Sequence, residues 1–263
     1  MERLRTYGKE PFDVVVVHGG PGAGGEMAPV ARALADCRGV LEPIQTGNSV
    51  QAQIQELRMD IVRHGHPPVI LVGFSWGAWL SMIVAARYPA LVSELILIGS
   101  GPLEESYASK VHDTRMTRLT RREQQAFNEH LTSLVTADAK DRAEHLVRLG
   151  ALTCKTDTYE PTADASDAGG DVLANADIFQ SVWQEAAELR REGELLRIAE
   201  NLRCPVLAIH GDYDPHPAEG VREPLARVIE DFEWVLLENC GHKPWREREA
   251  RQTFFRVLED SIC

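Results

Sequence analysis

The stretch Gly73-Phe74-Ser75-Trp76-Gly77 decides the fold of this chain. It has the form G-x-S-x-G, follows the apolar run 69–72 and precedes the apolar, helix-compatible run 78–86. A strand, a tight turn and a helix in that order form a nucleophile elbow, in which the turn lifts the serine Oγ out of the sheet. The alternative is a serine that only caps a buried helix. The flanking glycines and the preceding strand favour the elbow, and the helix N-terminus favours negative charge there.

Short apolar runs alternate with helical patterns along most of the chain. The runs expected to form strands are 12–17, 40–41, 69–72, 95–98, 206–209 and 232–237. The segments expected to form helices are 27–35, 51–62, 75–87, 218–229 and 246–258. Pro224 is expected to kink the fourth helix or delay its start. The alternation predicts an α/β fold with a mostly parallel, doubly wound sheet and helices on both faces.

Strand signals stop between residues 103 and 200, where the pattern is helical. The sequence therefore predicts a core of residues 1–102 and 201–263 with an inserted helical cap, or lid, of residues 103–200. This insert is either an ordinary helical subdomain or a cover over the strand ends, where open α/β sheets bind ligands.

Three helices are expected within the insert. Thr120-Arg121-Arg122-Glu123 is a capping box that begins the first, Asp138 begins the second, and the third spans about 178–199. Residues 163–170 have little to bury and predict a loop.

Composition excludes several classes of partner. The chain has 263 residues, of which 44% are hydrophobic and 26% charged, as in ordinary globular proteins. Its net charge of −12 disfavours nucleic acid and anionic membranes, which need basic patches. No apolar run is long enough to span a bilayer, and the short run 14–17 does not form a signal peptide.

The cysteine pattern bears on the compartment. The chain has five cysteines, an odd number, and no pair has C-x-x-C spacing. Free thiols in a reducing cytoplasm therefore fit better than a disulfide framework or a zinc site. We expect a cytoplasmic protein, and the sequence leaves its oligomeric state open.

Further motifs follow the expected strands in a meaningful order. His210-Gly211-Asp212-Tyr213-Asp214-Pro215 follows one strand, and Gly241-His242 follows the last. Ser75 needs a base to remove its proton, and His242 titrates in the right range. Asp214 is the candidate acid that orients and stabilises the imidazole. The order Ser75, Asp214, His242 is that of an α/β-hydrolase catalytic triad.

An oxyanion needs preorganised donors. The backbone N–H of Trp76, directly after Ser75, is one candidate. The loop His18-Gly19-Gly20-Pro21-Gly22 follows the first strand and offers another, with Gly20 favoured over Gly19. Glycines there let the backbone approach a substrate closely.

Each of these assignments has a rival. Asp212 competes with Asp214, but is better explained as a turn residue that hydrogen-bonds the backbone. Rival bases are His18 and His210, which end buried strands and suit structural roles, and His216, which is expected to be exposed. Glu104 and Glu105 are alternative acids for a variant triad, but a boundary of the cap is the simpler interpretation of both. Cys240 is an alternative nucleophile, but a packing role is the simpler interpretation.

With these motifs the chain resembles the α/β-hydrolase fold superfamily over most of its length. His18-Gly19-Gly20-Pro21-Gly22, Ser75-Trp76-Gly77 and Gly241-His242-Lys243-Pro244-Trp245 are similar to the proline iminopeptidase and cofactor-free haloperoxidase branch. The segment Glu42 to Ser49 departs from that branch, since it lacks the usual Asp/Gln-x-Arg-Gly-x-Gly-x-Ser. Only about ten residues precede the first valine-rich strand, so the usual N-terminal hairpin is shortened or absent.

Cap residues bear on the substrate. An aminopeptidase needs acids that bind an ammonium group, and the cap has Glu185, Glu188, Glu192 and Glu194, which are also spaced as a solvated helix face. Apolar cap residues either line a pocket or form the cap's own core; they are Met116, Leu119, Phe127, Leu131, Phe179 and Trp183.

The sequence thus predicts a serine hydrolase that cleaves a small or medium-sized, partly apolar ester or amide through an acyl-enzyme on Ser75. His242 then activates water, and the reaction needs no metal or organic cofactor. One alternative is a proline iminopeptidase-like exopeptidase. The other is a non-catalytic ligand-binding protein on the same fold.

Overall fold

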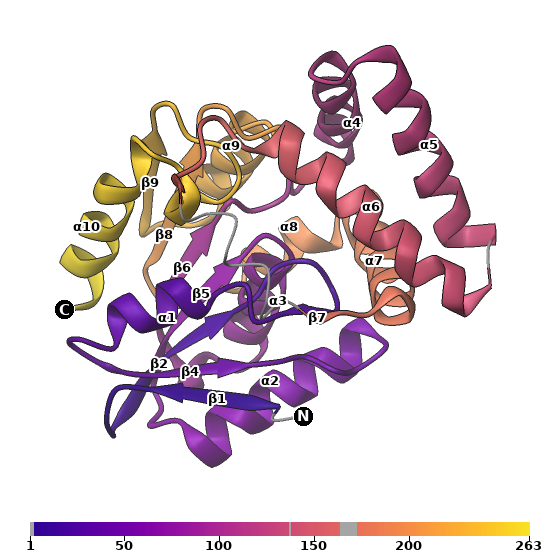
Figure 1. The fold of residues 1–263 in the computed structure, drawn as a ribbon. Coiled ribbons are helices and arrows are strands. Elements are labelled where there is room, and N and C mark those ends of the chain that lie inside the picture. Colours follow the sequence, from indigo (N-terminus) through magenta and orange to yellow (C-terminus); the bar gives the residue numbers. More distant parts are fainter. Residues whose placement is uncertain (1–2, 137, 164–172) are drawn as a thin grey trace.

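A seven-stranded sheet forms the centre of the computed structural model, which describes residues 3–136, 138–163 and 173–263 (Figure 1). In spatial order its strands are β1 (Leu4–Tyr7), β4 (Gly39–Pro43), β2 (Phe12–Val17), β5 (Val69–Phe74), β6 (Val92–Ile98), β8 (Val206–Gly211) and β9 (Phe232–Leu237). The edge strand β1 pairs antiparallel with β4, and the other pairings are parallel. The expected mostly parallel α/β sheet is confirmed.

Alternation along the central strands divides the core between the two faces of the sheet. Val15, Val17 and Leu71 belong to the cluster on one face, whereas Val14 and Val16 belong to the cluster on the other. Successive side chains of a strand point to opposite faces, so a strand without polar residues is buried on both sides. Helices must therefore cover both faces, as the sequence predicts.

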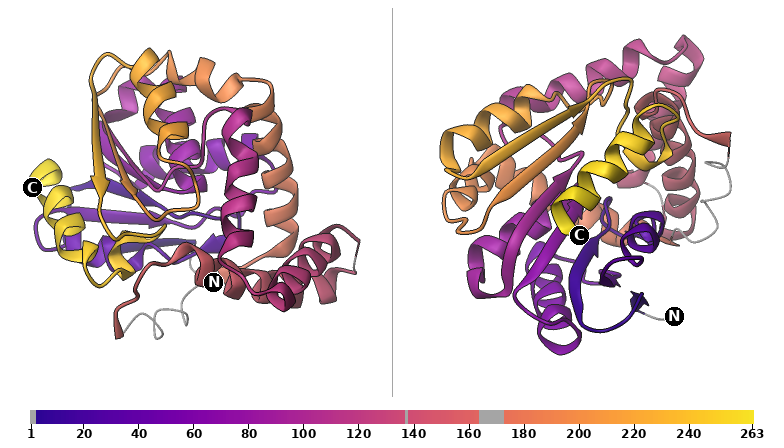
Figure 2. Two further views of the ribbon diagram at one scale, coloured as in Figure 1. Left: turned by 90° about the horizontal axis from the view of Figure 1, so that it is seen from above. Right: turned by 90° about the vertical axis from the view of Figure 1, so that its left-hand side faces the viewer.

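The core helices lie on these two faces (Figures 1 and 2). One face is covered mainly by α2 (Val50–His64), α3 (Trp76–Arg87) and α9 (Glu219–Val228). The other is covered by α1 (Ala28–Leu34) and α10 (Ala250–Ile262). Pro224 lies inside α9, which begins at Glu219 without a delay. Short 3-10 helices span Pro89–Leu91, Glu105–Tyr107 and Pro244–Arg246.

A helical cap connects β6 to β8. Its helices are α4 (Ala108–Thr117), α5 (Arg121–Thr136), α6 (Ala139–Asp157), α7 (Ala176–Arg191) and α8 (Glu194–Ala199), of which α4 to α7 lie beside the sheet at the right of Figure 1. The capping box is confirmed, because Thr120 Oγ1 and the Glu123 carboxylate each accept the other residue's backbone N–H at 3.4 and 2.9 Å. α6 begins directly after Asp138, as expected.

One local expectation about the cap is wrong, and another cannot be compared with the described residues. The single helix expected over 178–199 is wrong, because Gly193 has φ +72° and separates α7 from α8. A left-handed residue ends a helix, and glycine takes this conformation without a Cβ penalty. Most of the loop expected over 163–170 lies outside the described residues.

Strands that the sequence did not reveal are short. The four-residue β1 replaces the N-terminal hairpin that was expected to be shortened or absent. A second, two-stranded sheet pairs β3 (Ala23–Gly24) with β7 (Leu173–Ala174). Elements of two to four residues are too short to show a periodic pattern.

A disulfide joins Cys37, after α1, to Cys263 at the C-terminus, with Cα atoms 5.9 Å apart. The expectation that every cysteine is a free thiol is wrong for this pair and holds for Cys154, Cys204 and Cys240. The two partners are 226 residues apart, so no spacing motif marks them. The argument from free thiols to a reducing compartment therefore falls away.

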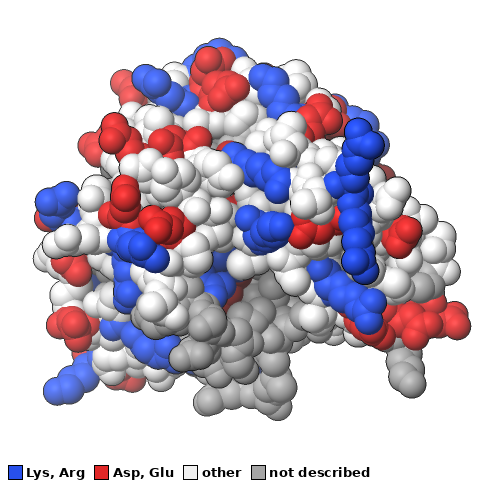
Figure 3. Space-filling model, turned by 45° about the horizontal axis from the view of Figure 1, so that its top comes forward, with Lys and Arg blue, Asp and Glu red and all other residues white. Residues whose placement is uncertain are grey.

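On the face shown in Figure 3, acidic and basic side chains are interspersed and not gathered by sign. Among the described helices, none is both long enough and apolar enough to cross a membrane.

Candidate active site

Ser75 occupies the sharp turn between β5 and α3. Its backbone has φ +53° and ψ −115°, a conformation that residues other than glycine rarely adopt. Its N–H donates to the carbonyl of Ile98 on the neighbouring strand at 2.9 Å. The side chain is half-buried. The turn therefore presents the hydroxyl at the carboxyl end of a central strand, as an elbow requires.

Glycines on either side of Ser75 make this turn sterically feasible. A Cβ at Gly73 would lie 2.3 Å from the carbonyl oxygen of Gly77, and a Cβ at Gly77 would lie 2.4 Å from the carbonyl oxygens of Val17 and His18. No side chain fits at these distances. The close approach of strand and helix inferred from the sequence is therefore observed at both positions.

Ser75, His242 and Asp214 form a continuous hydrogen-bonded chain. His242 Nε2 lies 3.1 Å from Ser75 Oγ, and His242 Nδ1 lies 2.7 Å from Asp214 Oδ2. Because an ionised carboxylate only accepts, Nδ1 carries the proton and Nε2 is free to accept from the serine hydroxyl. This is the tautomer in which a histidine can act as a general base towards serine.

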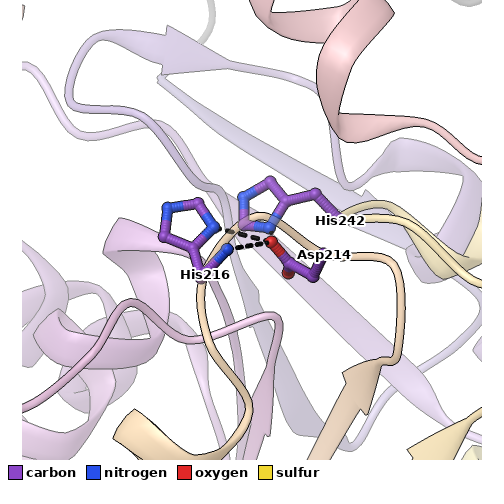
Figure 4. A group of neighbouring side chains, drawn as sticks. All are labelled: Asp214, His216 and His242. Carbon is purple, nitrogen blue, oxygen red and sulfur yellow. Dashed lines mark hydrogen bonds and ion pairs between the residues drawn. The ribbon is translucent and has the colours of Figure 1, made fainter. Parts of the chain in front are cut away.

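Asp214 is surrounded by imidazoles (Figure 4). Its Oδ1 accepts from the backbone N–H of His216 at 3.0 Å and from His216 Nδ1 at 2.7 Å, and His210 Nε2 lies 3.7 Å from Oδ2. Burial alone would raise the pKa of Asp214, but the neighbouring His242, His216 and His210 outweigh it and hold that pKa well below its usual value. Asp214 is therefore ionised, and both of its carboxylate oxygens accept hydrogen bonds.

The His216 expectation is wrong: this residue is buried, not exposed. Burial lowers its pKa to about 4, so the ring is neutral near pH 7. The residue that sequence reasoning set aside as a surface rival is thus a direct partner of the candidate acid. Its nearness to Asp214 in the sequence is the one signal that could have revealed it.

Asp214, His216 and His242 are also residue types that bind divalent metals, and their ligand atoms lie within 4.8 Å of one another. In both imidazoles, however, Nδ1 lies 2.7 Å from a carboxylate oxygen, which is a charge-assisted hydrogen-bond distance. The two rings donate to different oxygens of Asp214. The arrangement suits proton handling.

The loop of His242 packs closely on the end of the sheet. Gly99 has φ +51°, and a Cβ there would lie 2.9 Å from the carbonyl oxygen of His242. The ring of Phe74, directly before the candidate nucleophile, lies 4.8 Å from the imidazole of His242 between centroids. These contacts fix the imidazole next to the elbow.

The glycine loop after β2 lies beside the elbow. A Cβ at Gly19 would lie 2.7 Å from an edge carbon of Phe74, and Gly20 is partly accessible with φ +32°. Trp76 is the first residue of α3, and N–H groups in a first turn have no acceptor within the helix. An ion pair between Glu26 and Lys243, 2.7 Å long, links the glycine loop to the loop of His242.

Two rivals of the candidate residues, the exposed Asp212 and the buried His18, have structural partners. Asp212 Oδ1 accepts the backbone N–H of Cys240 at 3.1 Å, as expected of a turn residue. The ring of His18 contacts the carbonyl oxygen of Gly19 at 2.8 Å through Nδ1 and accepts the N–H of Gln45 at 3.2 Å through Nε2, and burial lowers its pKa.

The other rivals are also occupied away from Ser75. Glu104 and Glu105 pair with Arg227 and Arg190 at 2.6 and 2.8 Å. Cys240 is buried, which raises the pKa of its thiol well above the usual range, so it is no nucleophile near pH 7.

The apolar cap residues divide between two roles. Leu119 and Phe127 are buried in the cap's own core, with Met116 and Phe179 packed against it. Leu131 is exposed. Trp183 is partly exposed and stacks on Trp79 of α3, with ring centroids 6.0 Å apart and ring planes 4° apart.

The cap acids do not gather at Ser75. Glu185 accepts the backbone N–H of Val50 at the start of α2 at 2.8 Å. Glu194 pairs with Arg197 at 2.9 Å, whereas Glu188 and Glu192 are exposed. The solvated-face interpretation fits three of the four.

Comparisons with known proteins show the family of the chain. A family model described as the alpha/beta hydrolase fold matches residues 49–245. A pimeloyl-[acyl-carrier protein] methyl ester esterase of Aromatoleum aromaticum is 26% identical over 243 residues, which cover 89% of this chain and 92% of that protein. The proline iminopeptidase PfmaB of Pestalotiopsis fici is 25% identical over 176 residues, 66% of this chain and 60% of that protein.

Among solved structures, the crystal structure of VinJ is similar with a TM-score of 0.73 and 19% identity, covering 98% of this chain and 93% of that one. At that identity the likeness concerns the fold.

Proposed function

The chain belongs to the alpha/beta hydrolase fold family, and we propose that it is a serine esterase that uses Ser75, His242 and Asp214 as its catalytic triad. One observation carries the proposal. The hydroxyl of Ser75, on a strained strand-to-helix turn, lies 3.1 Å from an imidazole nitrogen whose opposite nitrogen lies 2.7 Å from a buried carboxylate. That arrangement activates a serine for acyl transfer.

In the proposed first step Ser75 Oγ attacks the ester carbonyl carbon while its proton passes to His242 Nε2. Asp214, held ionised, stabilises the imidazolium that forms. Negative charge develops on the carbonyl oxygen, and the backbone N–H groups of Trp76 and Gly20 are the proposed donors to it. His242 then gives its proton to the departing alkoxide, which leaves as an alcohol, and the acyl group remains on Ser75.

In the second step His242 takes a proton from water, and the resulting hydroxide attacks the acyl carbon. The tetrahedral intermediate breaks the bond to Ser75 Oγ, and His242 returns the proton to that oxygen. One ester and one water thus give one acid and one alcohol. Each transfer uses groups of this chain, and the proposed reaction needs no metal or organic cofactor.

We propose a small or medium-sized, partly apolar substrate beneath a lid of residues 103–200, on a core of 1–102 and 201–263. Trp79 lies one helical turn after Ser75 on α3, and Trp183 of the cap stacks on it. The partly exposed ring of Trp183 offers apolar contact to an acyl group, and the buried Trp79 supports that ring. The esterase among the relatives covers nearly the whole chain, which supports an ester substrate.

The occupied carboxylates favour an esterase over an iminopeptidase, which must bind a substrate ammonium group. Of the buried acids that the structure describes, each already has a partner; they are Glu42, Asp60, Asp157, Asp214 and Glu247. The iminopeptidase among the relatives matches only 60% of its own length to this chain.

A fluorophosphonate probe tests the triad. The wild-type protein is expected to be labelled at Ser75 and Ser75→Ala to remain unlabelled, with Ser109→Ala, an exposed serine on α4, as the matched control. Equal labelling of wild type and Ser75→Ala would overturn the catalytic assignment and favour a ligand-binding protein. A panel of methyl and p-nitrophenyl esters against amino-acid anilides then separates esterase from peptidase.

A further inference from the structure

The cap is attached to the loop of the candidate base through backbone hydrogen bonds. The cap segment that follows α6 runs antiparallel to the loop after β9, with an isolated bridge between Pro161 and Glu247. Arg248 N–H donates to Glu160 O at 2.8 Å, and Thr162 N–H donates to Arg246 O at 2.9 Å. Two segments about 85 residues apart in the sequence therefore share a short ladder.

One carboxylate lies at the centre of this ladder. Glu247 is 1% exposed, and it accepts three backbone N–H groups. Its Oε1 accepts from Gly241 at 3.0 Å and from Tyr159 at 2.9 Å, and its Oε2 accepts from Glu160 at 2.8 Å. Tyr159 and Glu160 belong to the cap, and Gly241 belongs to the loop of His242. The side chain of Glu247 therefore joins the cap segment to that loop.

These bonds reach the candidate base directly. The backbone N–H of His242 donates to the carbonyl oxygen of Asp157 at 2.7 Å, and the preceding N–H, of Gly241, is the one that Glu247 accepts. A Cβ at Gly241 would lie 2.2 Å from the Asp157 carbonyl oxygen and 2.5 Å from Glu247 Oε1. Only glycine permits this contact, so the backbone around His242 is fixed from the cap side.

The cap segment has its own support. Arg115 of α4 donates to both carboxylate oxygens of Asp157, at 2.9 and 2.6 Å. Arg118 donates to the carbonyl oxygen of Thr156 at 2.7 Å, and its guanidinium lies 3.6 Å from the ring centroid of Tyr213. Bidentate pairs of this kind fix geometry as well as charge. The acceptor of the His242 N–H is thus held by a second cap helix.

We propose that Glu247 is a positioning residue of the active site, which sets the place of His242 by fastening its loop to the cap segment 157–160. The proposal rests on the function proposed above. Without the carboxylate, three buried N–H groups lose their acceptor, which favours a movement of the two segments away from each other. Such a movement carries His242 away from Ser75 Oγ, and a displacement of about 1 Å can cost on the order of 100-fold in rate.

The test compares Glu247→Gln and Glu247→Ala with Glu249→Ala. Glu249 is an exposed acid of the same loop that binds only the side chain of Asn239, at 2.7 Å, among the described contacts. Active sites are counted with the fluorophosphonate probe, and ester turnover is expressed per counted site. We expect kcat to fall on the order of 10- to 100-fold in Glu247→Ala, with KM within about twofold. Glu247→Gln, which keeps one oxygen, recovers part of kcat, and Glu249→Ala matches wild type.

A proton NMR spectrum distinguishes a displaced His242 from a general loss of stability. The His242 Nδ1 proton, shared with the Asp214 carboxylate, gives a far-downfield signal in a folded, inhibitor-free protein. This signal is expected to shift or broaden in Glu247→Ala and to stay in place in Glu249→Ala. A folded Glu247→Ala with wild-type kcat and an unmoved signal would refute the positioning role.

Native-state hydrogen exchange of the wild-type protein covers the case in which the variants do not fold. The amides of Gly241, His242, Tyr159 and Glu160 are expected to exchange together and slowly, as members of one network. Exchange of the Gly241 and His242 amides at the rate of an open loop, independent of the cap amides, would overturn the proposal. Labelling of Ser75→Ala at the wild-type rate is a separate result, which refutes the triad itself.

Discussion

The imidazoles of His216 and His242 lie with their ring centroids 4.5 Å apart, and each donates to a different oxygen of the same carboxylate. The acid of the proposed triad therefore cannot turn without breaking a bond to one of them. The second imidazole, which is neutral near pH 7, extends the Ser75 chain by one member beyond Asp214.

Removal of the second imidazole is predicted to slow catalysis. In His216→Ala the Asp214 carboxylate loses one of its two bonds on Oδ1, and a hydrogen bond to a charged group contributes about 1.5–3 kcal/mol, or at least about tenfold in rate. The less solvated carboxylate also favours the imidazolium, so the acid limb of kcat/KM moves to higher pH. A pH–rate profile measures both effects. His216→Asn restores a donor and part of the rate, and the exposed His66→Ala is the control; an unshifted acid limb in His216→Ala would contradict this role.

Stability is predicted to fall as the solution becomes acidic, through the same residue. Because burial lowers the pKa of His216 from 6.5 to about 4, the unfolded chain binds a proton between these values that the folded protein does not. The contribution of the neutral His216 to the free energy of unfolding is complete above about pH 6.5. On the order of 3 kcal/mol of it is lost as the pH falls to 4. Urea unfolding at pH 7.5, 6.5, 5.5 and 4.5 measures it, and His216→Asn is expected to lose less over that range. Parallel curves for the two proteins would exclude His216 as the source.

The elbow glycines are predicted to be irreplaceable. Gly77→Ala places a methyl group 2.4 Å from two carbonyl oxygens, which overpacks the junction of β2 and α3 and costs about 2–3 kcal/mol or more. Gly150→Ala in α6 meets nothing within 4 Å and is expected to stabilise the protein by about 0.5–1 kcal/mol. Urea unfolding of both variants, with fluorophosphonate labelling, tests the contrast. Equal stability of the two would show that the elbow yields to a side chain.

The disulfide is predicted to contribute measurably to stability. Reduction, or Cys263→Ser, frees a loop of 226 residues and is expected to cost about 2–4 kcal/mol. Thiol titration of the unfolded, unreduced protein is expected to detect Cys154, Cys204 and Cys240 alone. Cys154→Ser, at an exposed site, is the control. Detection of all five thiols without reductant would show that the bridge does not form.

The sheet and the proposed triad could be read from the sequence because each depends on local patterns. Phe12–Val17 and Phe232–Leu237 form strands with the expected bounds, since short runs rich in apolar and β-branched residues and bounded by turns favour strands. The elbow motif marks Ser75, and strand order alone brings Asp214 and His242 to the same edge of the sheet. The structure then adds the distances between them.

The contacts that the sequence did not reveal join residues far apart along the chain. Glu247 holds Tyr159 and Glu160, and Cys37 meets Cys263, without any motif at either end. The burial of His216 depends on the way the loop after β8 folds back over His210, whose Nε2 lies 2.8 Å from the carbonyl oxygen of His216. Tertiary packing decides such contacts, and local patterns do not encode it.

The parallel indoles of Trp79 and Trp183 also give the protein an optical property. One belongs to the helix of the elbow and the other to the cap, and their ring planes lie within 4° of each other. Excited states of two stacked indoles couple, so the near-ultraviolet circular dichroism and the fluorescence of this pair depend on their separation. A movement of α7 away from α3 would therefore change the intrinsic fluorescence of the chain, and a stopped-flow instrument can time it without an added label.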